Sequence, residues 1–411
     1  HPWRATRLVR VLAGAAPEGP ATEVDATQID PLEGVPLAEI ARRSRAMHRS
    51  QGFDSPLREI PLHCWLAGVA GTPAGRDVFD QVDTTWNRIP GGDAVGPEME
   101  EIARAFDPEH PGRTAERLAH LRPRVATLAD SRAQYKLAEM DELIAFCLGA
   151  RLAVTAGVRE VVPGASLTMP VEAAGGERLL TVPRNQPYTQ PYWLRLPHGP
   201  YAYAVEQQQL AGLAEQPPGL AVRLSIRVAG EEIEFERPVM GPDNPASPVA
   251  VVPRVSLSLA ERVYLFPDGG PRPVTVHVRS RFGAQSGRLA LTTAPGWRAE
   301  PAVAPFEAGE TGEPAVVSFS VTPPARQARD LCRAAASIGG EEFSRGVVEV
   351  AYPGLPRRAA LVPAAAILLR TDVQVAARSI GYVMGPGDEV PDALRQMGCR
   401  AQPLGVDDEA Q

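Results

Sequence analysis

The sequence predicts a multidomain α+β protein, and three features of the 411-residue chain support this prediction. Between Asp93 and Gly157, apolar residues recur three and four positions apart, as they do in amphipathic helices. From Arg159 to Leu369, short stretches alternate polar and apolar side chains and are separated by Gly, Pro and Asn, which is typical of β-sandwiches. The 42 prolines favour short strands with many turns over long helices, because proline cannot donate a ladder hydrogen bond.

Residues 1–90 are predicted to combine three strands with one helix. Arg7–Leu12 predicts a short strand, and Glu23–Ile29 alternates polar and apolar side chains as a half-buried strand does. Pro36–Ser50 predicts an amphipathic helix with proline at its first position. The chain is expected to return as a strand over Leu57–Val69.

Residues 91–158 are predicted to form a helical linker region. The apolar periodicity places its helices at Met99–Phe106, Arg113–Leu121 and Tyr135–Thr155, the last being the longest. Three prolines are expected to mark the breaks between helices: Pro108, Pro111 and Pro123.

Two β-sandwiches are predicted to follow, at 159–248 and 249–370. In the first, alternating stretches on both sides of Ala229-Gly230-Glu231 indicate a hairpin. The composition of 241–248 indicates a linker between the two modules. The second module has six strand candidates at immunoglobulin-like spacing.

Residues 371–411 predict the start of a second α/β domain. An apolar strand at 379–385 precedes a short helix, with Asp388 as its N-cap and Gly398 closing it, and a further strand begins at Cys399. Strand, helix and strand in this order predict a parallel pair. We expect the core of this domain, and that of residues 1–90, to be incomplete, with apolar faces exposed.

Composition excludes some classes of function. The net charge of -7, with arginines scattered among carboxylates, does not favour nucleic-acid binding. No apolar run reaches the roughly 18 residues of a membrane-spanning helix. The four cysteines form no C-x-x-C pair, so we interpret them as small buried side chains or as a disulfide.

No zinc site is predicted, because the seven histidines include no H-x-x-H, H-E-x-x-H or H-P-D-D motif. His48 is the most suggestive histidine, either near the rim of an active site or as a helix C-terminal residue that complements the dipole. Five side chains crowd into 77–88: Asp77, Asp80, Asp83, Trp86 and Arg88. The three carboxylates could bind a cation or shape a sugar site with Trp86 as a stacking face, and the alternative is a capped loop with solvated acids.

The stretch Asn185–Trp193 is rich in aromatic residues and prolines. Its Tyr188, Tyr192 and Trp193 suggest a carbohydrate platform, whereas the alternative is a plug for a sandwich edge. The GPGDE sequence at 385–389 lacks the lysine and spacing of a phosphate-binding loop, so a strand-to-helix turn is the better interpretation.

Several stretches together resemble the long bacterial form of the PIG-L/LmbE-like zinc de-N-acetylases. SRAMHRSQGF, at 44–53, resembles a helix late in the catalytic domain of that family, and RDVFDQVDTTWNRIPGG resembles the segment that follows it. The module at 249–355 is similar to sandwich domains associated with carbohydrate-binding modules. IGYVMGPGDEVPDALRQMGC is similar to the start of a glutamine-amidotransferase-like domain.

The resemblance implies that residues 1–90 are the C-terminal part of a Rossmann-like α/β deacetylase domain. It implies Zn²⁺ in the complete parent, where a metal-bound water attacks the acetamide of an N-acetylglucosamine-type substrate. The family's two zinc motifs do not occur in this chain, so no catalytic or metal-ligating residue is transferred, and no cofactor is expected in the fragment. His48 and Gln51 match the helix pattern and are assigned only packing or ligand-supporting roles.

Three hypotheses follow for the chain. It is a catalytically inactive piece of a zinc amide hydrolase with accessory modules, a carbohydrate-binding or surface-anchoring protein, or a scaffold with a degenerate hydrolase remnant. The expected partner is a glycan or an amino-sugar conjugate, with Trp86, Tyr192 and Trp193 as contacts and a periplasmic or extracellular location favoured; the sequence does not define an oligomeric state. The carbohydrate hypothesis also predicts that replacing Trp193 or Trp297 with Ala abolishes sugar binding.

Overall fold

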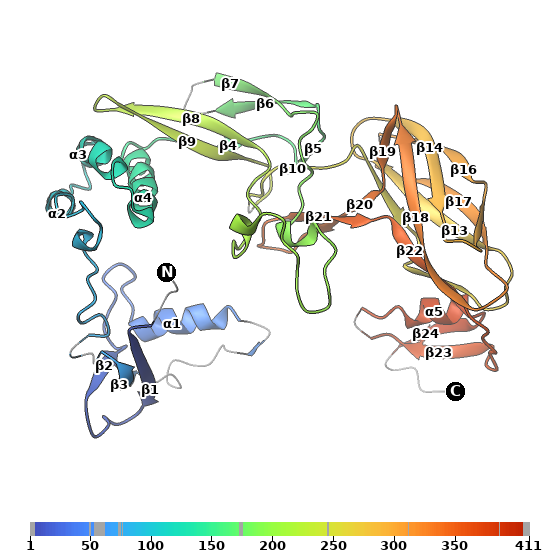
Figure 1. Cartoon of the computed structure of the whole chain (residues 1–411), viewed down its shortest axis with the longest axis horizontal. Helices are drawn as coiled ribbons and strands as arrows, with labels where there is room; N and C mark the ends of the chain where they lie inside the picture. Colours follow the sequence, from blue (N-terminus) through green and yellow to red (C-terminus); the bar gives the residue numbers. More distant parts are fainter. Residues whose placement is uncertain are drawn as a thin grey trace. The chain divides into compact units, whose positions relative to one another are not determined.

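The computed structural model describes residues 5–48, 51–52, 62–72, 75, 77–171, 176–244, 246–310, 312–385 and 387–405. The fold is mixed α+β and mostly β-sheet, with five α-helices among these residues (Figure 1). The chain divides into two compact units, His1–Ile144 and Ala145–Gln411. No helix in the described part of the chain is both long and apolar enough to cross a membrane.

The first unit begins with a three-stranded antiparallel sheet in the order β1-β3-β2. Its strands are β1 (Arg7–Ala13), β2 (Ala21–Asp25) and β3 (His63–Gly71), and α1 spans Leu37–Ala46. These elements agree in type and order with the predicted ones, although residues 57–61 of the predicted third strand lie outside the described residues. Apolar side chains on this sheet are exposed, including Leu8 at 57% and Val11 at 64%.

Three helices follow: α2 (Gly96–Arg104), α3 (Pro111–Ala126) and α4 (Ser131–Cys147). The prediction that Pro123 breaks a helix is wrong, because Pro123 lies inside α3. Asp141 of α4 accepts two hydrogen bonds from Arg122 of α3, with Nε and Nη2 at 2.6 and 3.0 Å.

The predicted helix over Tyr135–Thr155 is too long at its C-terminal end. It ends at Cys147, and Gly149 adopts the left-handed conformation with φ +64° that commonly follows a helix. Val154–Thr155 is a strand, β4, so the boundary of the β region lies earlier than the predicted position at 158.

The described strands between 154 and 240, apart from β5, form one five-stranded sheet rather than the sandwich predicted for 159–248. Its order is β7-β6-β4-β9-β8, with these bounds: β6 (Ser166–Val171), β7 (Gly176–Thr181), β8 (Ala221–Val228) and β9 (Glu231–Met240). The predicted hairpin is confirmed, because Ala229 and Gly230 have φ of 50° and 88°, as a tight turn between right-twisted strands requires. Between β7 and β8 the proline-rich chain makes only two short 3-10 turns, η5 (Tyr192–Leu194) and η6 (Gln208–Leu210), which leaves no strands for a second sheet.

The expected linker at 241–248 is fastened to its surroundings. Gly241 donates a backbone hydrogen bond to Ser247 at 2.7 Å. Immediately after it, β10 (Ala250–Val251) pairs in parallel with β5 (Glu160–Val161), which lies in the chain between β4 and β6.

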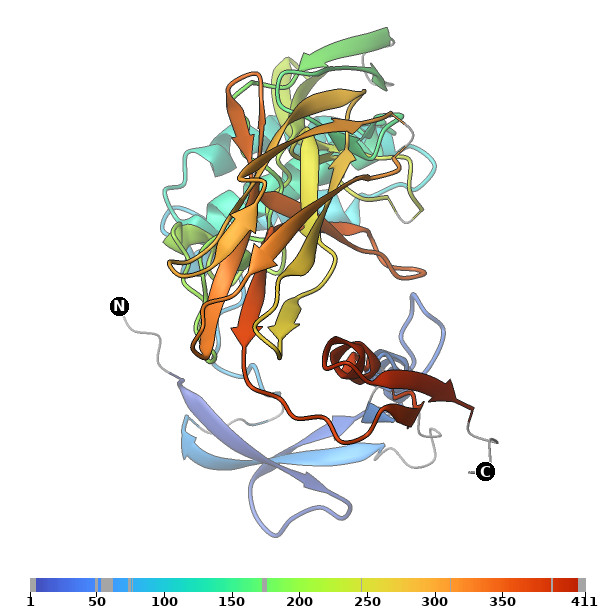
Figure 2. The same cartoon turned by 90° about the vertical axis from the view of Figure 1, so that its right-hand side faces the viewer.

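Residues 255–370 form two sheets around one buried core, in a sandwich-like arrangement. One sheet has the order β11-β13-β17-β15 and the other β12-β22-β18-β14-β16, with β19 beside β18; their strands lie in the foreground of Figure 2. The bounds are β11 (Val255–Leu259), β12 (Val263–Phe266), β13 (Arg272–Ser280), β14 (Gln285–Thr292), β15 (Arg298–Glu300), β16 (Val303–Ala308), β17 (Ala315–Thr322), β18 (Ala328–Ile338), β19 (Glu341–Phe343) and β22 (Ala365–Arg370). Alternate residues of these strands point inward, and Phe266, Phe319 and Leu289 are fully buried.

A separate antiparallel hairpin, β20 (Arg345–Val350) and β21 (Arg358–Pro363), leads from this core toward the residues near 190 and 247. All four cysteines are free thiols, so the disulfide interpretation is wrong. Cys332 and Cys399 are buried, as small apolar side chains are.

The predicted strand–helix–strand unit is present near the end of the chain. The parallel strands β23 (Ser379–Val383) and β24 (Arg400–Leu404) flank α5 (Val390–Gln396). Asp388 Oδ1 accepts from the Val390 N–H at 3.0 Å, although the cap position itself is Glu389, and Gly398 closes the helix with φ +96°.

Candidate functional site

The segment at 183–194 crosses the second unit between β7 and β8 and forms walls of two cavities. Thr189 fastens it to β10, because its N–H donates to the Val251 carbonyl and its Oγ1 accepts from the Val251 N–H, both at 2.8 Å. Gln190 fastens it to β21, where its amide accepts from the N–H of Leu361 and donates to the carbonyl of the same residue. The segment is therefore held on both sides.

The first cavity, here the tyrosine cavity, encloses about 650 Å³ between this segment and the two-sheet core. One wall comes from Arg184, Asn185 and Tyr188. The opposite wall comes from the start and the turns of the sandwich: Arg254, Phe282, Gln285, Glu341 and Glu342. Its size lies within the range of ligand pockets, roughly 300–1,000 Å³.

Four charged side chains in the tyrosine cavity have no partner in the part of the chain that the structure describes. Among the residues that the structure describes, the side chains of Arg184, Arg254, Glu341 and Glu342 make no hydrogen bond and no ion pair. Guanidinium and carboxylate groups offer several planar donors or acceptors, so they are free to bind a polar ligand here.

Two aromatic rings accompany these groups. Tyr188 is half-buried, and burial followed by the nearby Glu341 carboxylate raises the pKa of its phenol. The phenol therefore keeps its proton at neutral pH and can donate a hydrogen bond. Phe282 is 54% exposed, so its ring is accessible to a ligand in the cavity.

The second cavity, here the tryptophan cavity, has a volume of about 380 Å³ and is lined by other residues of the same segment. Trp193, Leu194, Pro218, Val249 and Val350 are among its lining residues. Three arginines and four carboxylates also line it, and all of them take part in ion pairs: Arg159, Arg357, Arg358, Glu160, Glu215, Asp243 and Glu349.

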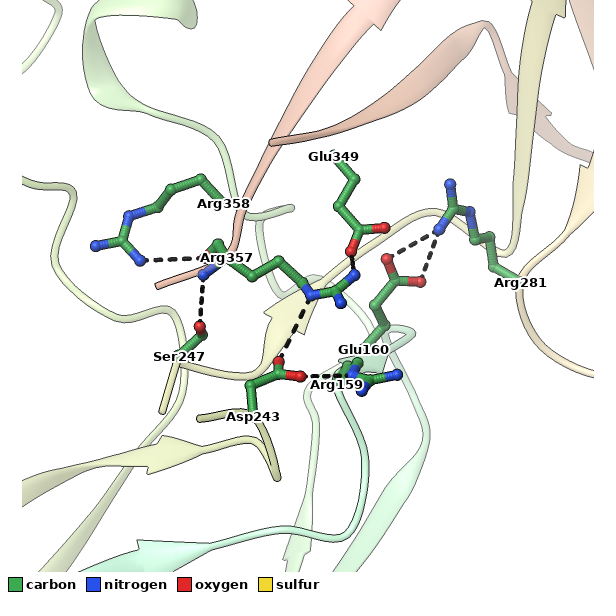
Figure 3. Close-up of polar contacts among 8 residues, drawn as sticks. All are labelled: Arg159, Glu160, Asp243, Ser247, Arg281, Glu349, Arg357 and Arg358. Carbon is green, nitrogen blue, oxygen red and sulfur yellow. Dashed lines mark hydrogen bonds and ion pairs between the residues drawn. The ribbon is translucent and has the colours of Figure 1, made fainter. Parts of the chain in front are cut away.

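The ion pairs around this cavity form a network that joins three segments of the chain (Figure 3). Asp243 of the 241–248 segment lies between Arg159 and Arg357, with its carboxylate oxygens 2.7 and 3.6 Å from their Nε atoms. Arg357 also pairs with Glu349 of β20, and its backbone N–H donates to Ser247 Oγ at 2.7 Å.

A further ion pair connects the segment of Arg159 to the sandwich. Arg281, which follows β13, donates from Nη1 to both carboxylate oxygens of Glu160 at 2.9 Å. The side chains of this pair are only 16% and 25% exposed, so solvent screens the interaction less than it screens a surface pair.

The carbohydrate-contact residues predicted from the sequence occupy different places. Trp86 belongs to the first unit, where it starts a 3-10 turn at 86–88 and its side chain lies beside Gly96. Tyr192 is buried at 8% exposure and donates from its hydroxyl to the Leu213 carbonyl at 2.9 Å. Trp193 packs edge-on against Tyr192 and lines the tryptophan cavity.

Trp297 is not available for sugar contact. It is 6% exposed, packs against Phe266 at a centroid distance of 5.0 Å, and donates from Nε1 to Asp330 at 2.8 Å. Its place in the sandwich core corrects the expectation that it contacts a glycan.

His48 and Gln51 follow α1 and are exposed, and the Gln51 N–H donates to the His48 carbonyl at 3.0 Å. The acidic cluster of 77–86 forms turn caps. Asp77 Oδ1 accepts from the Phe79 N–H and Asp83 Oδ1 from the Thr85 N–H, each at 2.8 Å. The hydrogen bonds from Thr85 lower the pKa of Asp83. This is the arrangement of a capped loop, the alternative to a cation site.

Within the described residues, no three histidine, cysteine or acidic side chains are grouped closely enough to hold a metal ion. No catalytic step is assigned to the described residues.

The sequence reasoning missed the sandwich side of the tyrosine cavity. Arg254, Phe282 and Glu341 are far apart in the chain and far from Tyr188, so no local motif joins them. The one available signal was Phe282, an aromatic residue in the arginine- and glycine-containing turn after a strand.

Comparisons with known proteins identify no family. No family model matches the chain, and no curated protein matches it. Among solved structures, it is similar to WR4, an MSP family member of C. elegans, at 9% identity and a TM-score of 0.18, over 28% of this chain and 97% of that one.

Two bacterial α2-macroglobulins are also similar in part. A mutant of the Salmonella protein matches at 13% identity and a TM-score of 0.23, over 54% of this chain and 16% of that one. The native E. coli protein matches at 13% identity and a TM-score of 0.21, over 53% of this chain and 16% of that one. At these TM-scores none of the three likenesses supports a conclusion about this chain's fold or function.

Proposed function

We propose that this chain is a non-catalytic, glycan-binding part of a larger PIG-L/LmbE-like zinc de-N-acetylase, and that residues 145–411 hold an amino-sugar conjugate for the parent enzyme. The observation that carries the binding half of the proposal is the tyrosine cavity. Arginine and glutamate side chains there, which have no partner among the described residues, share one pocket of about 650 Å³ with two aromatic rings.

The chemistry of this cavity suits a saccharide. Sugar hydroxyl and acetamido groups need several donors and acceptors at once, which Arg184, Arg254 and Glu341 offer without breaking an existing bond. The apolar faces of a pyranose ring need a flat partner, which Tyr188 and Phe282 offer. Both signs of charge are present, so the cavity favours a neutral or zwitterionic sugar over a polyanion.

The remaining part of the proposal rests on the sequence resemblance. Residues 1–90 would be a remnant of the Rossmann-like catalytic domain, of which the structure describes a helix and an antiparallel three-stranded sheet. Zinc would be held by the complete parent, and the described residues supply no site for it.

Binding is tested with the full chain and N-acetylglucosamine, its dimer and its trimer, by isothermal titration calorimetry. Tyr188→Ala and Arg254→Ala should each weaken binding about tenfold or more, equivalent to about 1.4 kcal/mol. Tyr201→Ala is the matched control, because Tyr201 is 98% exposed and does not line the cavity. The proposal is contradicted if the wild-type chain does not bind these sugars. It is also contradicted if both cavity variants bind them with the wild-type affinity.

Catalysis is tested separately. The chain incubated with Zn²⁺ and an N-acetylglucosamine conjugate should release no acetate. Zinc-dependent release of acetate by residues 1–411 would overturn the assignment of a non-catalytic role, whether or not the sugar binds at the tyrosine cavity.

A further inference from the structure

The tryptophan cavity differs from the tyrosine cavity in the state of its charged groups. Each guanidinium and carboxylate that lines it has a partner, as in the ion pairs Arg159–Asp243 and Arg358–Glu215. Figure 3 shows the first of these two ion pairs. A charged ligand could bind ionically only by displacing one of these pairs, and would gain little by doing so.

The walls between these pairs are apolar. Trp193, Leu194, Pro191 and Pro218 come from the chain between β7 and β8, and Val350 and Ala360 come from the β20–β21 hairpin. An apolar surface in a concave site is stabilised when a ligand displaces water from it. The enclosed volume of about 380 Å³ is at the small end of the ligand-pocket range.

Two polar groups of the wall, the indole N–H of Trp193 and the side-chain amide oxygen of Gln216, have no hydrogen-bond partner among the residues that the structure describes. The indole N–H of Trp193 makes no hydrogen bond to any residue that the structure describes, whereas the indole of Trp297 donates to Asp330. A ligand that carries a carbonyl or ether oxygen on an apolar body would complement this donor.

From these three observations we infer that the tryptophan cavity is a second binding site, for an uncharged and largely apolar group such as an aryl or short acyl ester. This site goes beyond the proposed glycan site and does not depend on it. The apolar ligand contacts Trp193 and the residues of the β20–β21 hairpin that line the cavity. The ion pairs of Arg357 with Asp243 and Glu349 remain intact when it binds.

The probe is N-phenyl-1-naphthylamine, an uncharged aryl compound that fluoresces in apolar sites, added to the full chain. Methyl octanoate and octanoate serve as competitors, because they share the same acyl chain but only octanoate is charged. We expect the probe to bind and the ester to displace it, with octanoate about tenfold or more weaker. Absence of probe binding to wild type, or equal displacement by the charged acid, overturns the inference.

The location is tested with two variants that block the cavity from different walls. Ala360→Leu fills it from β21, and Ala214→Trp fills it from the exposed chain beside Glu215. Ala211→Trp is the matched control, because Ala211 is also exposed but does not line the cavity. Both blocking variants should lose probe binding while the control keeps it; retention by a folded Ala214→Trp protein overturns the location.

The same variants separate this inference from the proposed function. Ala214→Trp does not touch the tyrosine cavity, so it should bind N-acetylglucosamine oligosaccharides as wild type does. Loss of probe binding with retained sugar binding supports two separate sites. Loss of both together shows that the cavities are not independent and overturns the assignment of a second site.

Discussion

The side chain of Gln190 forms hydrogen bonds in both directions with the backbone of Leu361, 171 residues further along the chain. Gln190 is 4% exposed and Leu361 6%, so both bonds are protected from water. The side chain of Gln396 also forms hydrogen bonds in both directions with a strand backbone, that of β12. It accepts from the Leu265 N–H at 2.7 Å and donates to the Val263 carbonyl at 2.9 Å. In each case a glutamine amide supplies the donor and acceptor that a neighbouring strand would supply.

Replacing Gln190 with leucine should destabilise the second unit. The substitution keeps the volume but leaves the buried N–H and carbonyl of Leu361 without partners, at a cost of about 1–3 kcal/mol. Urea unfolding followed by far-ultraviolet circular dichroism measures the change. Gln209→Leu is the control, because Gln209 is exposed and should change stability little. Equal unfolding midpoints for the Gln190→Leu variant and wild type would show that this pair does not hold the segment.

Asp243→Asn should weaken the joint between the 241–248 segment and the β20–β21 hairpin. Asp243 is 14% exposed and pairs with two guanidinium groups, so removing its charge should cost roughly 1–2 kcal/mol. The loss should be smaller in high salt, which screens these pairs in wild type. Thermal unfolding in low and high salt provides the measurement.

The matched control for this prediction is Glu232→Gln. Glu232 pairs with Arg227 at 3.3 Å, but the two side chains are 50% and 81% exposed, so the pair should contribute less than about 0.5 kcal/mol. A similar effect of both substitutions would mean that the network of Asp243 acts as an ordinary surface pair.

Local patterns predicted the elements well but not their assembly. The β8–β9 hairpin followed from Ala229-Gly230, whose left-handed conformations a two-residue turn requires. Pro123 was misjudged, because a proline costs an interior helical hydrogen bond but packing of α3 compensates, with Leu121 and Val125 fully buried on either side of it. The strands within 159–248 were predicted, but the number of strands does not show whether they form one sheet or two packed sheets.

The site was predictable only on one side. The aromatic stretch at 185–193 was selected from its composition, and it does line both cavities. Its partners Arg254, Phe282 and Glu341 depend on how the sandwich lies against it, and long-range packing leaves no pattern in a single sequence. Tyr192 and Trp297 were predicted as contacts for a sugar, but both are buried. These aromatic residues therefore belong to the interior and not to a binding surface.

Trp297→Ala should destabilise the sandwich rather than remove a sugar contact. The substitution leaves a cavity beside Phe266 and an unpaired Asp330 carboxylate, at a cost of about 3–5 kcal/mol. Denaturant unfolding should show the loss. Trp193→Ala is the control, because half-buried Trp193 makes no hydrogen bond to a described residue and its removal should cost less. Comparable stability of the two variants would contradict the core position of Trp297.

The helix α1 should lose stability at low pH because of Glu39. Hydrogen bonds from Arg42 and Arg43 lower the pKa of this carboxyl from 4.5 to about 2. A carboxyl with a lower pKa in the folded state stabilises the fold above pH 4.5 and loses that contribution as the pH falls from 4.5 toward about 2. Glu39→Gln should therefore flatten the pH dependence of α1 in this window, as measured by the Cα chemical shifts of Leu37–Ala46. Glu18→Gln, in an exposed turn, should leave the wild-type dependence intact. An unchanged acid transition of α1 in Glu39→Gln would show that the helix does not depend on this carboxylate.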